Sequence, residues 1–165
     1  MHPHEPLPAL AERGTKHPLL WWDIAFVAVG LLMIGVGIAE VQPVNWHLAA
    51  VLGLLAALVI GYLMLGRSAL RRSSQHGEAT AAGYAFLIIL IAVIGVSTAF
   101  VPSFATMQAL GYPIIWWVLD RYRDAVLASG VLAIAVGTGS WAAYLRVGAD
   151  DPALPAVVVA ALSFA

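Results

Sequence analysis

Residues 81–101, AAGYAFLIILIAVIGVSTAFV, form an apolar stretch that contains no charged side chain and no histidine. A helix needs about 20 mostly apolar residues to cross the hydrocarbon layer, so this stretch predicts a transmembrane helix. The chain of 165 residues has the same character throughout, because 62% of its residues are hydrophobic and only 10% are charged. Soluble domains carry about 25% charged residues. We therefore expect a protein that crosses a bilayer several times.

The same length criterion divides the rest of the chain into further apolar stretches. They cover residues 19–39, 46–65, 103–119, 125–145 and 152–165. The stretch 103–119 is short, follows Pro102 and contains Pro113, and at the helical rise it reaches about 26 Å against a hydrocarbon layer of about 30 Å. The last stretch is too short to cross. The sequence thus predicts an all-α polytopic bundle over residues 19–165, with five complete spans and a truncated sixth.

The basic residues predict the orientation of this bundle, because short loops that carry Lys or Arg stay in the cytoplasm. Arg13 and Lys16 precede the first span, whereas Arg146 lies on the other side of the membrane. The remaining arginines follow the second and fourth spans and set the topology: Arg67, Arg71, Arg72, Arg121 and Arg123. We therefore expect a cytoplasmic N-terminus, with residues 1–18 as a disordered tail because they are polar and rich in proline.

Small side chains recur every four residues on two of the predicted helices. Gly53, Ala57 and Gly61 form one such ridge, and Ser129, Ala133 and Gly137 form the other. Small residues allow close helix contact in lipid. Each ridge is compatible with ordinary packing inside one chain or with a seam that slides or dimerises.

Polar residues inside the spans are few. Asp23 and Glu40 fall at the two ends of the first span, and no ionisable side chain lies near the middle of any span. Buried ionisable groups mark ion pathways, so an ion-coupled carrier is disfavoured. The candidates for a polar contact within the membrane are Ser97, Thr98, Gln108 and Tyr112, which could also be purely structural.

The chain lacks the residues that several classes of chemistry require. The chain has no cysteine, its net charge of −1 argues against a nucleic-acid partner, and its five histidines are not grouped as metal ligands. We find no catalytic, cofactor-binding or metal-binding motif.

Four stretches of the sequence carry a resemblance to a known family. They are LGRSALRR at 65–72, GYAFL at 83–87, FATMQALGYP at 104–113 and the basic corner RYR at 121–123, after a first helix that bears tryptophans. In this order they resemble the membrane sensor region of actinobacterial two-component histidine kinases of the thermosensor and nitrate-sensor class.

This resemblance implies a membrane input domain of a bacterial cell-membrane protein that passes a membrane or ligand signal to a cytoplasmic kinase domain beyond Ala165. It further implies a homodimer, a response regulator as partner, and ATP with Mg²⁺ in the kinase domain, with no cofactor in this segment. His76 lies between two spans and is not expected to be the phosphorylated histidine. A small transporter or channel component and a structural membrane subunit remain as alternatives.

Overall fold

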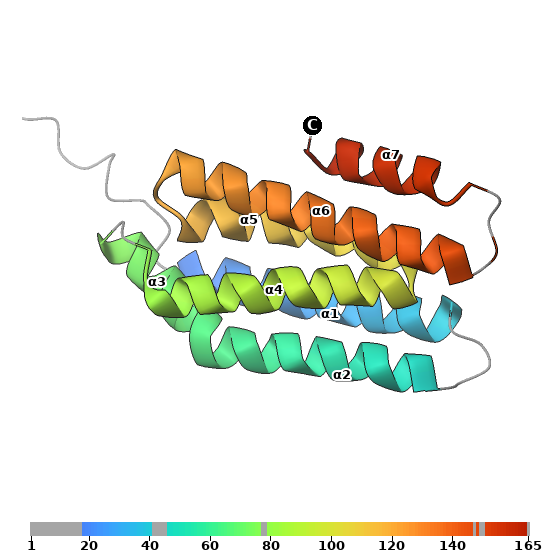
Figure 1. Cartoon of the computed structure of the whole chain (residues 1–165). Helices are drawn as coiled ribbons and strands as arrows, with labels where there is room; N and C mark the ends of the chain where they lie inside the picture. Colours follow the sequence, from blue (N-terminus) through green and yellow to red (C-terminus); the bar gives the residue numbers. More distant parts are fainter. Residues whose placement is uncertain (1–17, 41–45, 77–78, 147, 149–150, 165) are drawn as a thin grey trace, which may run out of the picture.

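A computed structural model describes residues 18–40, 46–76, 79–146, 148 and 151–164, and every regular element in these ranges is helical. The α-helices are α1 (Pro18–Glu40), α2 (Trp46–Gly61), α3 (Arg67–His76), α4 (Ala81–Phe100), α5 (Gln108–Val118), α6 (Tyr122–Arg146) and α7 (Ala153–Phe164). Two further elements are the π-helix η2 (Tyr62–Gly66) and the 3₁₀-helix η3 (Pro102–Met107). The predicted all-α class is confirmed (Figure 1). The predicted tail lies outside the described residues, apart from Pro18.

Four helical segments are long and apolar enough to cross a membrane, and they characterise the chain as a membrane protein. They are Leu19–Glu40, Trp46–Ser73, Ala81–Phe100 and Tyr122–Arg146. The prediction of five complete spans and a truncated sixth is therefore not confirmed. The two predicted spans that fall short are the segment of η3 and α5, which is not one continuous α-helix, and α7, which has 12 residues.

The segment of η3 and α5 nevertheless runs between the two ends of the bundle. Its first residues contact α1, where the Ser103 hydroxyl donates to Glu40, and its last turn contacts α3, where the Ser73 hydroxyl donates to the Trp117 carbonyl over 2.6 Å. A 3₁₀-helix rises about 2.0 Å per residue, so the segment extends about 28 Å. The segment is thus longer than the sequence predicted, and its length is closer to the thickness of the hydrocarbon layer. Pro113 does not end α5, which continues to Val118.

The second span continues well past its predicted end. We expected a loop after Leu65, but the chain passes through η2 into α3, and Figure 1 shows that it bends there. The sequence pattern of α3 explains the difference, because Ala69 and Leu70 are buried while Arg71 and Arg72 are exposed. A helix with one apolar edge can pack across the end of a bundle.

Contacts between the helices define two ends of the bundle. At one end, which we call the arginine-bearing end, Arg67 pairs with Asp23, and the Tyr84 hydroxyl donates to Asp124. The five topology-setting arginines, Arg67, Arg71, Arg72, Arg121 and Arg123, lie on α3 and at the start of α6, at this end. At the opposite end the Arg146 guanidinium lies 5.3 Å from the centre of the Phe100 ring. The grouping of the arginines matches the sequence analysis, and the assignment of this end to the cytoplasm stays a prediction.

Small residues form the closest helix contacts of the bundle. Gly139 of α6 lies so close to α4 that an added Cβ would collide with the carbonyl oxygen of Gly95. On the next face of α6, Ser129, Ala133 and Gly137 are buried, and Gly137 packs against Ala156 and Ala160 of α7. This predicted ridge therefore serves packing within the chain.

The other predicted ridge is not buried in the same way. Gly61 packs against Ile89 of α4, whereas Gly53 and Ala57 are exposed on α2. An added Cβ at Gly53 would meet no atom within 4 Å. The face of Gly53 and Ala57 is thus not part of the helix packing that the structure describes.

Candidate functional site at the arginine-bearing end

Three polar side chains meet where α1 passes the bend between α2 and α3. The Tyr62 hydroxyl donates a hydrogen bond to Asp23 Oδ1 over 2.7 Å, and Arg67 Nη2 donates to Asp23 Oδ2 over 2.9 Å. We call Asp23, Tyr62 and Arg67 the Asp23 cluster. It links the first helix to a bend in the second, and both carboxylate oxygens of Asp23 take part.

The π-helix η2 is what brings Tyr62 and Arg67 to the same side of the chain. In an α-helix, side chains three or four residues apart lie on the same face. In a π-helix the backbone hydrogen bonds join residues five apart, so the turn is wider. The backbone N–H of Arg67 donates to the Tyr62 carbonyl, which is this pairing. Without the wider turn, the two side chains would point in different directions and could not share one carboxylate.

Aromatic packing fixes the position of Tyr62. Its ring stacks on Phe26 with 3.8 Å between the centroids and an angle of 21°, and the Phe86 ring lies 6.1 Å away. Gly66 packs directly against the two rings. A Cβ there would come within 2.8 Å of the Tyr62 ring and 3.0 Å of the Phe86 ring. Tyr62 and Phe86 are buried, so packing holds the Tyr62 ring in the position from which its hydroxyl reaches Asp23.

The electrostatic strength of the cluster is modest. The side chains of Arg67 and Asp23 are 49% and 30% exposed, and an ion pair of this exposure is worth about 0 to 1 kcal/mol. A hydrogen bond to a charged group contributes about 1.5 to 3 kcal/mol, so the buried Tyr62 hydroxyl contributes more than the arginine. A contact of this size holds a helix in place but can still open and close.

The helix that the cluster holds is the least buried of the four long helices. Only 11% of the apolar window of α1 is buried in the bundle, against 50% for α4 and 44% for α6. Three residues of α1 are buried, namely Phe26, Met33 and Gly37, which follow one narrow line along the helix. The Asp23 cluster therefore adds polar contacts to a helix with little buried surface, as the Ser103–Glu40 hydrogen bond does at the other end.

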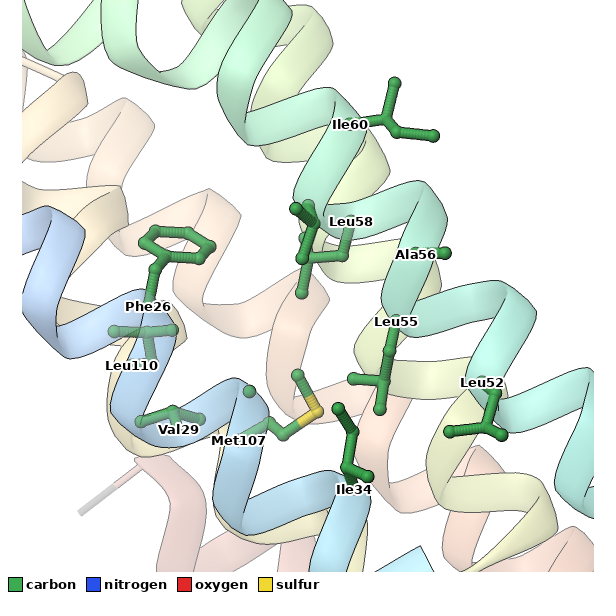
Figure 2. A pocket seen from close by; sticks show the side chains of 12 residues that line it. Phe26, Val29, Ile34, Leu52, Leu55, Ala56, Leu58, Ile60, Met107 and Leu110 are labelled. Atoms are coloured by element: carbon green, nitrogen blue, oxygen red, sulfur yellow. The ribbon is translucent and has the colours of Figure 1, made fainter.

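An apolar groove separates α1 from α2 beyond the cluster. Its deeper part has a volume of about 320 Å³ and is lined by side chains of α1, α2, η3 and α5, among them Phe26, Leu55 and Met107 (Figure 2). Its shallower part, of about 360 Å³, reaches Asp23 and Arg67. We call these two connected parts the α1–α2 groove. Along this groove α1 and α2 are separated by an apolar hollow.

The polar residues singled out from the sequence lie elsewhere. Thr98 is buried and its hydroxyl donates to the Ile94 carbonyl over 2.8 Å, the bond within its own helix that we expected. The oxygen atoms Ser97 Oγ and Gln108 Oε1 are buried and have no hydrogen-bond partner among the described residues. Tyr112 is half-buried against the core. The four residues belong to α4 and α5, whereas the Asp23 cluster is formed by α1, η2 and α3.

Asp23 and Arg67 both stood out in the sequence, but their pairing is a finding of the structure. The predicted topology already placed both near the same end of the bundle, and an acidic residue beside a span needs a partner. Nothing in the sequence indicated that Tyr62 would join them, since that contact depends on the π-helix.

Comparison of the chain with protein families, with curated proteins and with solved structures finds no match.

Proposed function

We propose that this chain is the membrane input module of a signalling protein, in which α1 moves relative to the bundle and so reports a change in the bilayer or a bound ligand. The observation that carries this proposal is a barely buried α1 that polar contacts hold near its two ends, through the Asp23 cluster at one end and through the Ser103–Glu40 hydrogen bond at the other. A purely structural subunit has no need for a helix held so weakly.

The proposed movement has a route to the arginine-bearing end. Tyr62 and Arg67 belong to the π-helix and to the start of α3, so a shift of α1 that pulls on Asp23 acts on the bend itself. π-helices are rare and appear mostly as single turns inside α-helices, frequently at functional sites. In this proposal the bend at η2 is the two-state element that a switch requires.

The output in this proposal is a cytoplasmic histidine kinase domain that follows residue 165. The resemblance of the sequence to actinobacterial sensor kinases supports it, and it would act as a homodimer that autophosphorylates with ATP and Mg²⁺ and passes the phosphoryl group to a response regulator. In that arrangement the arginine-bearing end faces the cytoplasm of a bacterial cell. α7, which packs on α6, would carry the shift toward the kinase.

Distance measurements between spin labels test the movement of α1. The chain has no cysteine, so pairs of introduced cysteines label cleanly. One pair joins α1 to α6, at Leu32 and Ile134, and a control pair joins α4 to α6, at Ile88 and Ile134; all three side chains are exposed. Double electron–electron resonance would be recorded in bilayers with short, medium and long acyl chains.

The proposal expects the distance between labels at Leu32 and Ile134 to change by several ångströms across this series, because a helix tilts to match the hydrocarbon thickness. The distance between labels at Ile88 and Ile134 stays constant, because α4 and α6 are packed through Gly95 and Gly139. An unchanged distance for both pairs would contradict an input module.

A second candidate is a small transporter or channel component. The observation that favours it is the set of buried oxygen atoms without hydrogen-bond partners among the described residues, Ser97 Oγ, Gln108 Oε1 and Ser129 Oγ. Such atoms could line a path for a polar solute. Uptake of small polar solutes by proteoliposomes, lost on replacing Gln108 by leucine, would favour this function over the first.

A further inference from the structure

Three arginines converge on a hollow next to the Asp23 cluster. The hollow has a volume of about 610 Å³ and is lined by Leu19, Leu63, Arg67, Ser68, Arg71 and Arg72. We call it the arginine pocket. One of the three arginines, Arg67, pairs with Asp23. Three guanidinium groups thus line one hollow at the arginine-bearing end, and such a lining suits an anion.

The arginine pocket opens into the apolar groove rather than ending in solvent. Leu63 and Arg67 line both the pocket and the shallower part of the α1–α2 groove. Gly30 and Ile34 in turn line both the shallower and the deeper part of the groove. A charged chamber and an apolar track therefore form one continuous depression along α1, and Figure 2 shows the deeper part of this track.

We propose that this depression binds one anionic phospholipid, with the phosphate in the arginine pocket and an acyl chain in the α1–α2 groove. Guanidinium groups bind phosphate oxygens through two parallel N–H donors, and each basic side chain at the surface of an anionic leaflet favours binding. The lining of the depression changes from charged to apolar along α1, just as a phospholipid changes from a charged phosphate to apolar acyl chains. A soluble phosphate would use only the pocket, and a neutral apolar molecule only the groove.

The lipid would take the place beside α1 that the bundle leaves open, and its phosphate would compete with Asp23 for Arg67. The binding itself goes beyond the proposed input function, because a structural subunit or a transporter could hold such a lipid equally well. A failure of the spin-label experiment therefore leaves the lipid site standing, and a failure of lipid binding leaves the movement of α1 standing.

The proposal is tested by native mass spectrometry of the full chain in detergent, titrated with phosphatidylglycerol and, in parallel, with phosphatidylcholine. We expect one phosphatidylglycerol to bind more tightly than phosphatidylcholine. Replacing Arg71 and Arg72 by glutamine weakens phosphatidylglycerol binding about tenfold or more and changes phosphatidylcholine binding little. The matched control replaces Arg121 and Arg123 by glutamine, which removes the same charge from exposed residues at the same end and leaves binding unchanged.

A second pair of variants tests the acyl chain. Gly30→Leu fills the α1–α2 groove and weakens binding of phosphatidylglycerol, whereas Gly35→Leu, at a residue that does not line the groove, has no effect. Both glycines have no atom within 4 Å of an added Cβ, so both variants can fold. Equal binding of the two lipids, or a loss that is the same in test and control variants, overturns the proposal. A loss with the arginine variant but not with Gly30→Leu also overturns it, because that pattern indicates headgroup binding alone.

Discussion

Tyr62 and Asp23 are 39 residues apart in the sequence, and a hydrogen bond of 2.7 Å joins the tyrosine hydroxyl to the aspartate carboxylate. The Tyr62 ring at the same time stacks on Phe26, which lies about one turn further along α1 than Asp23. One residue of the π-helix therefore contacts α1 twice, once through its ring and once through its hydroxyl. A variant that lacks only the hydroxyl therefore loses the polar contact with Asp23 and keeps the ring packing on Phe26.

Tyr62→Phe should reduce the free energy of unfolding by about 1.5 kcal/mol, because it removes a buried hydrogen bond to a charged group and keeps the stacked ring. Unfolding in mixed micelles of SDS and a mild detergent measures this change. The matched control is Tyr84→Phe, since the Tyr84 hydroxyl also donates to a carboxylate, that of Asp124, but is exposed. We expect a loss within about 0.5 kcal/mol for the control. Equal losses would mean that the hydroxyl of Tyr62 has no special role.

The ion pair of the cluster should be weaker than its tyrosine contact. A double-mutant cycle with Asp23→Asn and Arg67→Gln should give a coupling energy of at most about 1 kcal/mol, because both side chains are partly exposed. The corresponding cycle with Asp23→Asn and Tyr62→Phe should give a larger value. The opposite order of the two coupling energies would show that the arginine, not the tyrosine, holds α1.

The contact between α4 and α6 should tolerate no added side-chain atom. Gly139→Ala places a methyl group against the Gly95 carbonyl oxygen, and we expect a loss of about 1 to 3 kcal/mol, because the two helices must separate. The same unfolding assay measures it. Gly53→Ala is the control, since its added methyl group meets nothing within 4 Å and alanine favours the helix. A Gly139→Ala variant as stable as the control would contradict the described packing.

The sequence was sufficient to predict the helices whose residues are apolar throughout. The stretch 81–101 differs from α4 by one residue, because nearly all of its side chains are apolar and the Thr98 hydroxyl bonds to its own helix. The ends of the bundle were also predictable, since the arginines alternate between connections. These features depend on the local sequence and on the hydrocarbon thickness alone.

Features that depend on contacts between helices were not predictable in the same way. The 3₁₀-helix that begins at Pro102 and the π-helix that begins at Tyr62 change the rise per residue and the directions in which side chains point. No local sequence pattern marks either helix type. The ridge of Gly53 and Ala57 has the same spacing as that of Ala133 and Gly137, yet only the latter is buried. Spacing shows that a helix can be approached closely, but not whether a neighbour within the chain does so.

The proposed kinase output requires the arginine-bearing end to face the cytoplasm, and so does binding of an anionic lipid from the inner leaflet. Single cysteines at Asp120, exposed at that end, and at Glu40, exposed at the other, can be labelled with a maleimide that does not cross membranes. In intact cells we predict labelling of Glu40→Cys only, and labelling of Asp120→Cys only after the membrane is opened. Labelling of Asp120→Cys in intact cells, with Glu40→Cys protected, would contradict the account.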